Sequence, residues 1–271
     1  LFENPFVDAS RAEKIVHSPE HQELALEAAR EGIVLLKNEN NLLPLRKGLK
    51  SVAVIGPNAD HALNQLGDYV PTKVLQDITT VLDGVKMIVS PQTAVTYVKG
   101  CEVSGAEFNE IDKARQAARH ADAAIVVAGE NEWQAEGGKG TSGEGYDAAT
   151  LELTGLQEDL VRAVAETGTP TVVVLVNGRP LAIRSIAEHV PAIVEAWIPG
   201  EQGGLAVADV LFGDANPSGK LPLTYPKYSA GFTWYDHKLS EEKGGNKFDP
   251  QWEFGHGLSY TTFVYRALRA D

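Results

Sequence analysis

Four short apolar segments that each end at a glycine limit the fold of this chain more than any other feature. They read SVAVIG, AAIVVAG, TVVVLVNG and AIVEAWIPG and begin at residues 51, 123, 171 and 192. Short continuous apolar runs of this kind, bounded by turn residues, are typical of strands buried on both faces of a parallel sheet. The segment VTYVKG, residues 95–100, is a fifth candidate strand. The sequence therefore predicts a mainly parallel β-sheet.

The segments between these strands have the pattern of helices. Helices are expected over residues 18–38, 108–122, 154–168 and 203–214. The first opens with Ser-Pro-Glu, and in the third Thr154 is the expected N-cap and Gly168 the expected C-cap. GKLPLTYP, residues 219–226, is expected to be an edge strand because its prolines exclude it from a sheet interior. Strands alternating with helices predict an α/β fold, a doubly wound sheet with helices on both faces.

Composition and motifs exclude several functions. The 271 residues are 43% hydrophobic, enough for a large core, and the formal net charge of −13 disfavours nucleic acids, anionic membranes and polyanionic substrates. No apolar run is long enough to span a bilayer. Cys101 is the only cysteine, so no intrachain disulfide forms, and we expect it to be buried. There is no metal-ligand spacing, phosphate loop or dinucleotide fingerprint, so we expect no metal and no cofactor, and a neutral ligand fits best.

An acidic, glycine-rich loop follows the strand that ends at Gly129. It reads GENEWQAEGGKGTSGEGYD and holds one tryptophan, Trp133, and five carboxylates: Glu130, Glu132, Glu136, Glu144 and Asp147. Ligands of parallel sheets bind at the carboxyl ends of the strands, where Glu130, Asn177 and Gly200 also lie. A glutamate on a flexible loop at this edge is a candidate general acid, although most loop carboxylates are merely solvated.

Several segments together resemble the enzymes of glycoside hydrolase family 3. They are EAAREGIVLLKNENNLLPL, SVAVIGPNAD, GRPLAI, EAWIPGEQGGLAVADVLFGDANPSGKLPLTYP and WEFGHGLSYTTF. The match is to the family's second domain, and it implies an α/β sandwich built on about six strands. In this family an upstream (β/α)8 barrel supplies an aspartate nucleophile, and the second domain supplies a glutamate acid/base on a loop that reaches the barrel. The barrel is absent from this chain.

The resemblance leaves two glutamates as candidates for the acid/base. SGEGYD followed by LELTG resembles the family's acid/base segment and favours Glu144, whereas the start GENEWQAE favours Glu136. We prefer Glu144. Trp133 and Glu130 are the expected substrate-binding residues. One departure is Ala148, where the family usually has an arginine after the aspartate, so the loop would need to be oriented by another group.

The resemblance implies a retaining, exo-acting β-glycosidase, a β-glucosidase or exo-β-glucanase. Its substrates would be β-linked glucosides or gluco-oligosaccharides, and TWYDHK, residues 233–238, favours these over xylosides. The alternative is a non-catalytic carbohydrate-binding or structural module with the same fold.

The chain is expected to be part of a longer protein, since it opens without methionine on a connector-like segment. Residues 1–20 would be an interdomain connector, 21–228 the α/β sandwich, and 229–271 a long loop with an extension toward a third domain. The chain alone is expected to be inactive. Its location is expected to be secreted or periplasmic, with the cytoplasm as the alternative.

Overall fold

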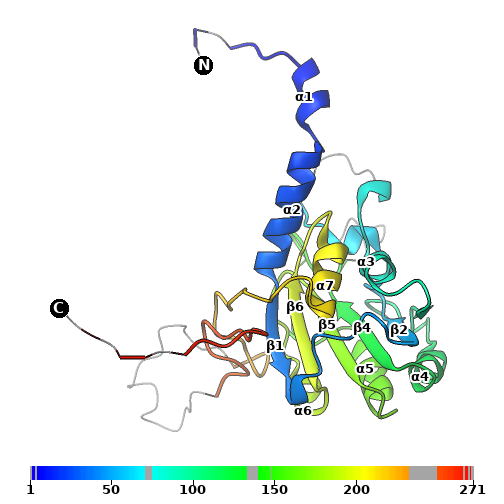
Figure 1. Cartoon of the computed structure of the whole chain (residues 1–271). Helices are drawn as coiled ribbons and strands as arrows, with labels where there is room; N and C mark the ends of the chain where they lie inside the picture. The colour runs from blue at the N-terminus through cyan, green and yellow to red at the C-terminus, as the bar shows by residue number, and fades with distance from the viewer. Residues whose placement is uncertain are drawn as a thin grey trace.

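The fold is built on one six-stranded sheet (Figure 1). The computed structural model describes residues 2–3, 5–70, 75–132, 140–146, 148–231, 249–264, 266–267 and 269. The strands are β1 (Val34–Asn38), β2 (Ser51–Ile55), β3 (Ala94–Val98), β4 (Ala123–Gly129), β5 (Thr171–Val176) and β6 (Ala192–Trp197). Their order in the sheet is β1-β6-β5-β4-β2-β3. All neighbours pair in parallel except β1, which runs antiparallel to β6 at one edge.

Helices cover both faces of the sheet, as the sequence predicts. On one face α2 (Pro19–Gly32), α3 (Val81–Ile88) and α7 (Gly203–Phe212) enclose one apolar cluster. On the other, α4 (Ile111–Arg119), α5 (Gln157–Ala165) and α6 (Arg184–His189) enclose a second. The short elements are α1 (Ser10–Ile15) and the 3₁₀ turns η1 (Glu39–Asn41), η2 (Ala62–Gln65) and η3 (Leu75–Asp77). Figure 1 shows α1 projecting from the sheet domain beyond α2. The predicted α/β sandwich is confirmed.

The helix predicted over residues 18–38 is right at its start and wrong at its end. Ser18 caps α2, since its Oγ accepts the His21 N–H at 3.4 Å and Pro19 occupies the first turn. The helix stops at Gly32, and residues 34–38 form β1 instead. The side chains of Val34, Leu35 and Leu36 are all 1% exposed or less. The side chains of β1 enter the apolar clusters on both faces of the sheet, whereas no residue of α2 is fully buried. Tertiary packing therefore overrides the helical periodicity.

Two further local predictions are wrong. Residues 219–226 form no strand, although Tyr225 makes an isolated antiparallel bridge with Trp252. The edge beside β6 is already occupied by β1. Thr154 does not cap α5, because its Oγ1 donates to the carbonyl of Val103 at 2.6 Å and the helix begins only at Gln157.

Three remaining expectations concern Cys101, membrane spans and the first domain boundary. Cys101 is fully buried, as predicted. None of the helices formed by the described residues has the length and apolar character needed to cross a bilayer. The predicted boundary between residues 20 and 21 falls inside α2.

Candidate active site

Polar side chains are concentrated where the central parallel strands end. The Asn58 amide donates to the carbonyl of Glu130 at 3.0 Å and to that of Val176 at 3.3 Å, so it links the ends of β2, β4 and β5. Asn64 donates in turn to the side-chain oxygen of Asn58 at 2.7 Å. The backbone of Gly200, after β6, is paired with that of Gln65. Glu130, Asn177 and Gly200 therefore follow the ends of the parallel strands β4, β5 and β6 at the same edge of the sheet.

Beneath this edge lies a wholly buried carboxyl group, that of Glu195 in β6. Its Oε1 accepts from the Asn177 amide and from the Trp197 N–H, both at 3.1 Å, and its Oε2 lies 3.1 Å from the Tyr225 hydroxyl. Burial raises the pKa of Glu195 to about 8, and the nearby Glu130 adds to the rise, while these hydrogen bonds oppose it. The Glu195 carboxyl group is therefore mainly neutral near pH 7. Its hydrogen bonds hold together the residues just below this edge of the sheet.

The ends of the acidic loop are held together by reciprocal hydrogen bonds. The N–H of Thr141 donates to the carbonyl of Asn131 at 2.9 Å, and the N–H of Asn131 donates to the Thr141 hydroxyl at 3.1 Å. The N–H of Ser142 also donates to the Asn131 carbonyl, at 3.1 Å. The backbone that leaves β4 is thus fastened to the backbone that returns before Glu144.

Glu144 lies on a tight turn with its side chain exposed to solvent. The turn closes through the Tyr146 N–H, which donates to the Gly143 carbonyl at 3.0 Å. Gly143 and Gly145 have φ values of 110° and 79°, a region that favours glycine. The glycines flanking Glu144 are therefore required by the backbone of the turn.

A second loop, between β2 and α3, holds this turn from the side. The Asp68 carboxylate accepts the backbone N–H of Glu144 at 2.8 Å, and the Tyr69 hydroxyl donates to the Glu144 carboxylate. That hydrogen bond raises the pKa of Tyr69 above its usual value. The Glu144 carboxyl group thus has a defined direction although it is exposed.

Glu130 is the second candidate residue brought to this edge, but it is buried. Its side chain is 7% exposed, and its Oε1 lies 3.0 Å from Nε of Arg179. Burial raises the pKa of Glu130, and the charge of Arg179 and a hydrogen bond from the Gly178 backbone counter the rise. Nη2 of Arg179 also donates a hydrogen bond to the carbonyl of Thr141 at 3.2 Å. Arg179 therefore connects Glu130 to the turn that holds Glu144.

The other candidate residues have different outcomes. Trp133 and Glu136 lie outside the described residues, as does Asp147. Ala148 is exposed. Sequence reasoning missed Asp68, Tyr69 and Arg179. The signal for Arg179 was its place two residues beyond Asn177 at a strand end, whereas the loop of Asp68 and Tyr69 carries no pattern that points to Glu144.

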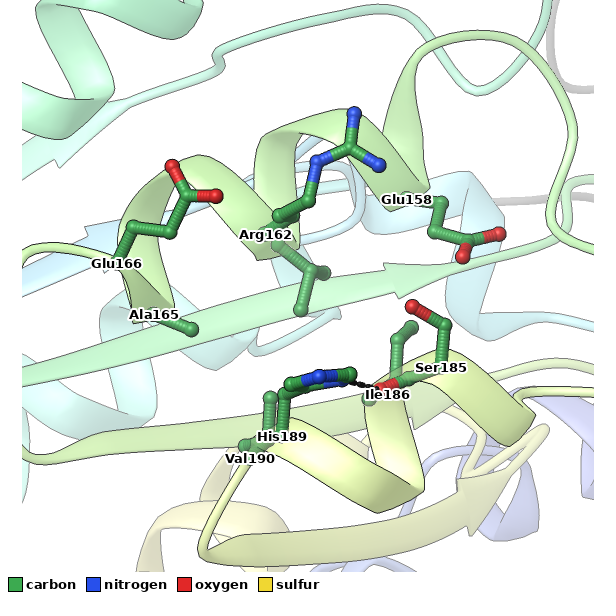
Figure 2. A pocket seen from close by; sticks show the side chains of 9 residues that line it. Glu158, Arg162, Ala165, Glu166, Ser185, Ile186, His189 and Val190 are labelled. Atoms are coloured by element: carbon green, nitrogen blue, oxygen red, sulfur yellow. Dashed lines mark hydrogen bonds between the residues drawn. The ribbon is translucent and has the colours of Figure 1, made fainter.

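A metal centre or a ligand groove could also lie away from this cluster. Among the residues with described positions, no group of three or more His, Cys, Asp or Glu side chains could hold a metal ion. A groove of about 250 Å³ lies between α5 and α6. Figure 2 shows the side chains that line it. Its lining residues are Glu158, Val161, Arg162, Ala165, Glu166, Ser185, Ile186, His189 and Val190, none of which contacts Glu130 or Glu144 in a described hydrogen bond or ion pair.

Comparison with known proteins gives a family match over most of the chain. Residues 33–260 match the profile described as "Glycosyl hydrolase family 3 C-terminal domain". The chain is 41% identical over 267 residues to a β-xylosidase from Formosa agariphila, an alignment that covers 93% of this chain and 36% of the relative. It is 36% identical over 278 residues to a periplasmic β-glucosidase from Salmonella typhimurium, covering 90% of this chain and 35% of the relative.

A solved structure has the same fold. The β-glucosidase EmGH1 from Erythrobacter marinus superposes with a TM-score of 0.84 at 35% identity, over 98% of this chain and 38% of its own. The chain therefore spans about a third of the length of the relatives it matches.

Proposed function

The chain belongs to glycosyl hydrolase family 3, as its C-terminal domain, and we propose that it supplies the general acid/base of a retaining, exo-acting β-glycosidase. The aspartate nucleophile would come from a (β/α)8 barrel upstream of this domain. The greater length of the relatives is consistent with such a further domain. The whole enzyme would be a β-glucosidase or exo-β-glucanase.

The observation that most supports this proposal is the presentation of Glu144. Its carboxyl group is exposed at the carboxyl edge of the sheet, yet Asp68 and Tyr69 fix the backbone and side chain of its turn. An acid/base that serves a sugar held by another domain needs both properties. Glu130, in contrast, is buried and paired with Arg179, so it cannot reach a partner domain directly.

The proposed reaction divides the work between two carboxyl groups. Glu144, protonated, donates its proton to the glycosidic oxygen as the nucleophile of the barrel attacks the anomeric carbon. Glu144, now a carboxylate, then removes a proton from the water that hydrolyses the glycosyl-enzyme. Retention requires the two carboxyl groups to lie about 5–5.5 Å apart in the assembled site. No cofactor or metal takes part in this scheme.

The proposed substrates are β-linked glucosides or gluco-oligosaccharides. The relatives include a β-xylosidase as well as β-glucosidases, so the choice of sugar depends on groups that the barrel would supply. The segment that favours glucosides, residues 233–238, lies outside the described residues. Trp133 is the proposed aromatic contact to the sugar. We also propose a secreted or periplasmic location, supported by the name of the relative from Salmonella typhimurium.

The direct test compares Glu144→Gln with Glu136→Gln in the protein that joins this domain to its barrel. Loss of a general acid costs about 10²- to 10⁴-fold in rate, and the loss is greatest when the leaving group is poor. We expect Glu144→Gln to show this loss on alkyl and phenyl β-glucosides and to retain much more activity on a dinitrophenyl β-glucoside. If Glu136→Gln shows this pattern and Glu144→Gln is near normal, the assignment is wrong. If neither variant changes turnover, the domain is a non-catalytic module.

The isolated chain provides a second test. Because the nucleophile and most of the sugar pocket would lie in the barrel, the 271-residue chain alone should not turn over an aryl β-glucoside. Measurable hydrolysis by the isolated chain, unaffected by removing contaminating activity, would show that the nucleophile lies within these residues.

A further inference from the structure

The Arg179 side chain connects three parts of the carboxyl edge that are distant in sequence. Arg179 lies in the loop after β5, and its Nε is 3.0 Å from Oε1 of Glu130, the first residue after β4. Its Nη2 donates to the carbonyls of Thr141 and Tyr146, at 3.2 Å and 3.5 Å. Thr141 and Tyr146 stand three residues before and two residues after Glu144. One guanidinium therefore holds both sides of the turn that presents Glu144.

The geometry suits arginine and would not suit lysine. A guanidinium offers five N–H donors in a fixed planar fork, so one edge can bind a carboxylate while the other binds carbonyls. A lysine ammonium is a point charge that could bind Glu130 without spanning to both carbonyls. The Arg179 carbonyl also accepts the Asn177 amide at 2.8 Å, which fixes the backbone from which the side chain extends.

Glu130 gives this arrangement its anchor. Its carboxyl group is buried, and Oε2 has no hydrogen-bond partner among the described residues, so Arg179 is its main compensation. A buried carboxylate with one cationic partner holds that partner in place, because separating the two leaves a charge uncompensated. The direction of the guanidinium, and with it the position of the turn, is therefore set from the end of β4.

We propose that Arg179 and Glu130 form a positioning pair that sets where the Glu144 carboxyl group is presented. The inference rests on the proposed function, which makes Glu144 the acid/base. In the part of the chain that the structure describes, Arg179 contacts this turn through main-chain carbonyls, so it acts through Glu144. Glu130 acts one step further away, through Arg179, and this differs from the direct contact with sugar expected from sequence.

The kinetic test uses Arg179→Met in the protein that includes the barrel, with Arg184→Met as a matched control. Arg184 is also paired with a glutamate, Glu188 at 2.8 Å, but it lies in α6. A displaced acid/base costs roughly 10- to 100-fold in kcat. We expect that loss from Arg179→Met on phenyl β-glucoside, less than about threefold loss on dinitrophenyl β-glucoside, and little change in KM. Arg184→Met should leave both substrates unchanged.

Two additional variants keep the test decisive if Arg179→Met folds poorly. Arg179→Lys keeps the charge beside Glu130 and should still lose activity selectively on the poor leaving group. Glu130→Gln should do the same more weakly. If instead Glu130→Gln raises KM equally for all substrates, Glu130 binds the sugar directly and the positioning pair is wrong. A loss from Arg179→Met that is equal for both leaving groups, or that persists in full when Glu144→Gln is also present, would also overturn it.

Hydrogen exchange on the isolated chain separates this inference from the proposed function. Arg179→Met and Arg179→Lys should speed exchange in the peptide that covers residues 140–146, while peptides from β4 and β5 remain as protected as before. Unchanged exchange in residues 140–146 would contradict the inference whatever the kinetics show. If exchange speeds up as expected but Glu144→Gln has no leaving-group dependence, the pair positions the turn and the proposed function is what fails.

Discussion

The interior of the sheet and its carboxyl edge are made from the same strands by different physical means. In β4 and β5 every residue is buried, and nearly all are apolar. The next residues, Glu130 and Asn177, are also buried but polar, and each depends on a particular partner: Glu130 on Arg179 from the loop after β5, and Asn177 on Glu195 of β6. The interior is therefore stabilised by burial of apolar surface, which tolerates substitution by similar side chains. The edge is stabilised by specific polar pairs, which do not tolerate such substitution.

The largest effect is expected at Gly129, where the two regions meet. A Cβ there would lie 1.9 Å from the Val176 carbonyl oxygen, and φ is +143°, so Gly129→Ala requires the backbone of β4 or β5 to move. We expect the free energy of unfolding to fall by more than about 4 kcal/mol, measured in urea. Gly48→Ala is the control, because no atom lies within 4 Å of its added Cβ. Equal stability of the two variants would mean that β4 and β5 are not paired as described.

An intermediate effect is expected from the buried carboxyl group of Glu195. Its pKa is about 8 in the folded chain and about 4.3 in an unfolded one, so the folded state holds the proton more tightly. The resulting stabilisation is complete below pH about 4 and is lost as pH rises toward about 8, by at most about 1.4 kcal/mol per pH unit. Glu195→Gln mimics the protonated form and should flatten this decline.

Urea unfolding of both proteins between pH 5 and pH 8 checks this prediction. Glu188→Gln is the control, because the hydrogen bond from Arg184 lowers the pKa of this exposed carboxyl group and its titration lies below that range. If the free energy of unfolding changes with pH equally in the wild type and in Glu195→Gln over this range, Glu195 is ionised in the folded chain.

The smallest effect is expected at the exposed side of the edge. Tyr69→Phe removes the hydroxyl that donates to Glu144, and it should change the free energy of unfolding by less than about 0.5 kcal/mol. The effect should instead be a loss of kcat on phenyl β-glucoside of less than about tenfold, smaller than that of Arg179→Met. Tyr228→Phe, which removes a hydroxyl paired with Arg184 instead, is the matched control. A larger loss than that of Arg179→Met would reverse the order of importance argued above.

The same comparison explains how much the sequence could predict. The interior strands were found because burial on both faces leaves a continuous apolar run, as in residues 171–176. The strand β1 was missed because Val34, Leu35 and Leu36 continue the apolar pattern of the helix past Gly32, and pairing with β6 makes these residues a strand. Residues 219–226 were expected to be an edge strand, yet the antiparallel edge of the sheet is formed by β1.

At the edge, the sequence identified the carboxyl groups and not their partners. Glu130 and Glu144 stand in one acidic loop, so their pattern is local. Asp68 and Tyr69 are 76 and 75 residues away from Glu144, and Arg179 is 38 residues from Thr141. These contacts exist only because parallel strands bring their carboxyl ends together, and no spacing in the sequence records them. The assignment of Glu144 over Glu136 thus remains a prediction for experiment.

The most direct test of the account is the product that the Glu144→Gln variant forms in azide, identified by NMR in the protein that includes the barrel. If Glu144 is the acid/base of a retaining enzyme, its loss slows attack of water on the glycosyl-enzyme. Azide attacks the glycosyl-enzyme without needing a general base. Azide should then accelerate turnover of dinitrophenyl β-glucoside and give the β-glucosyl azide. Glucose as the only product, with no acceleration by azide, would contradict the role assigned to Glu144.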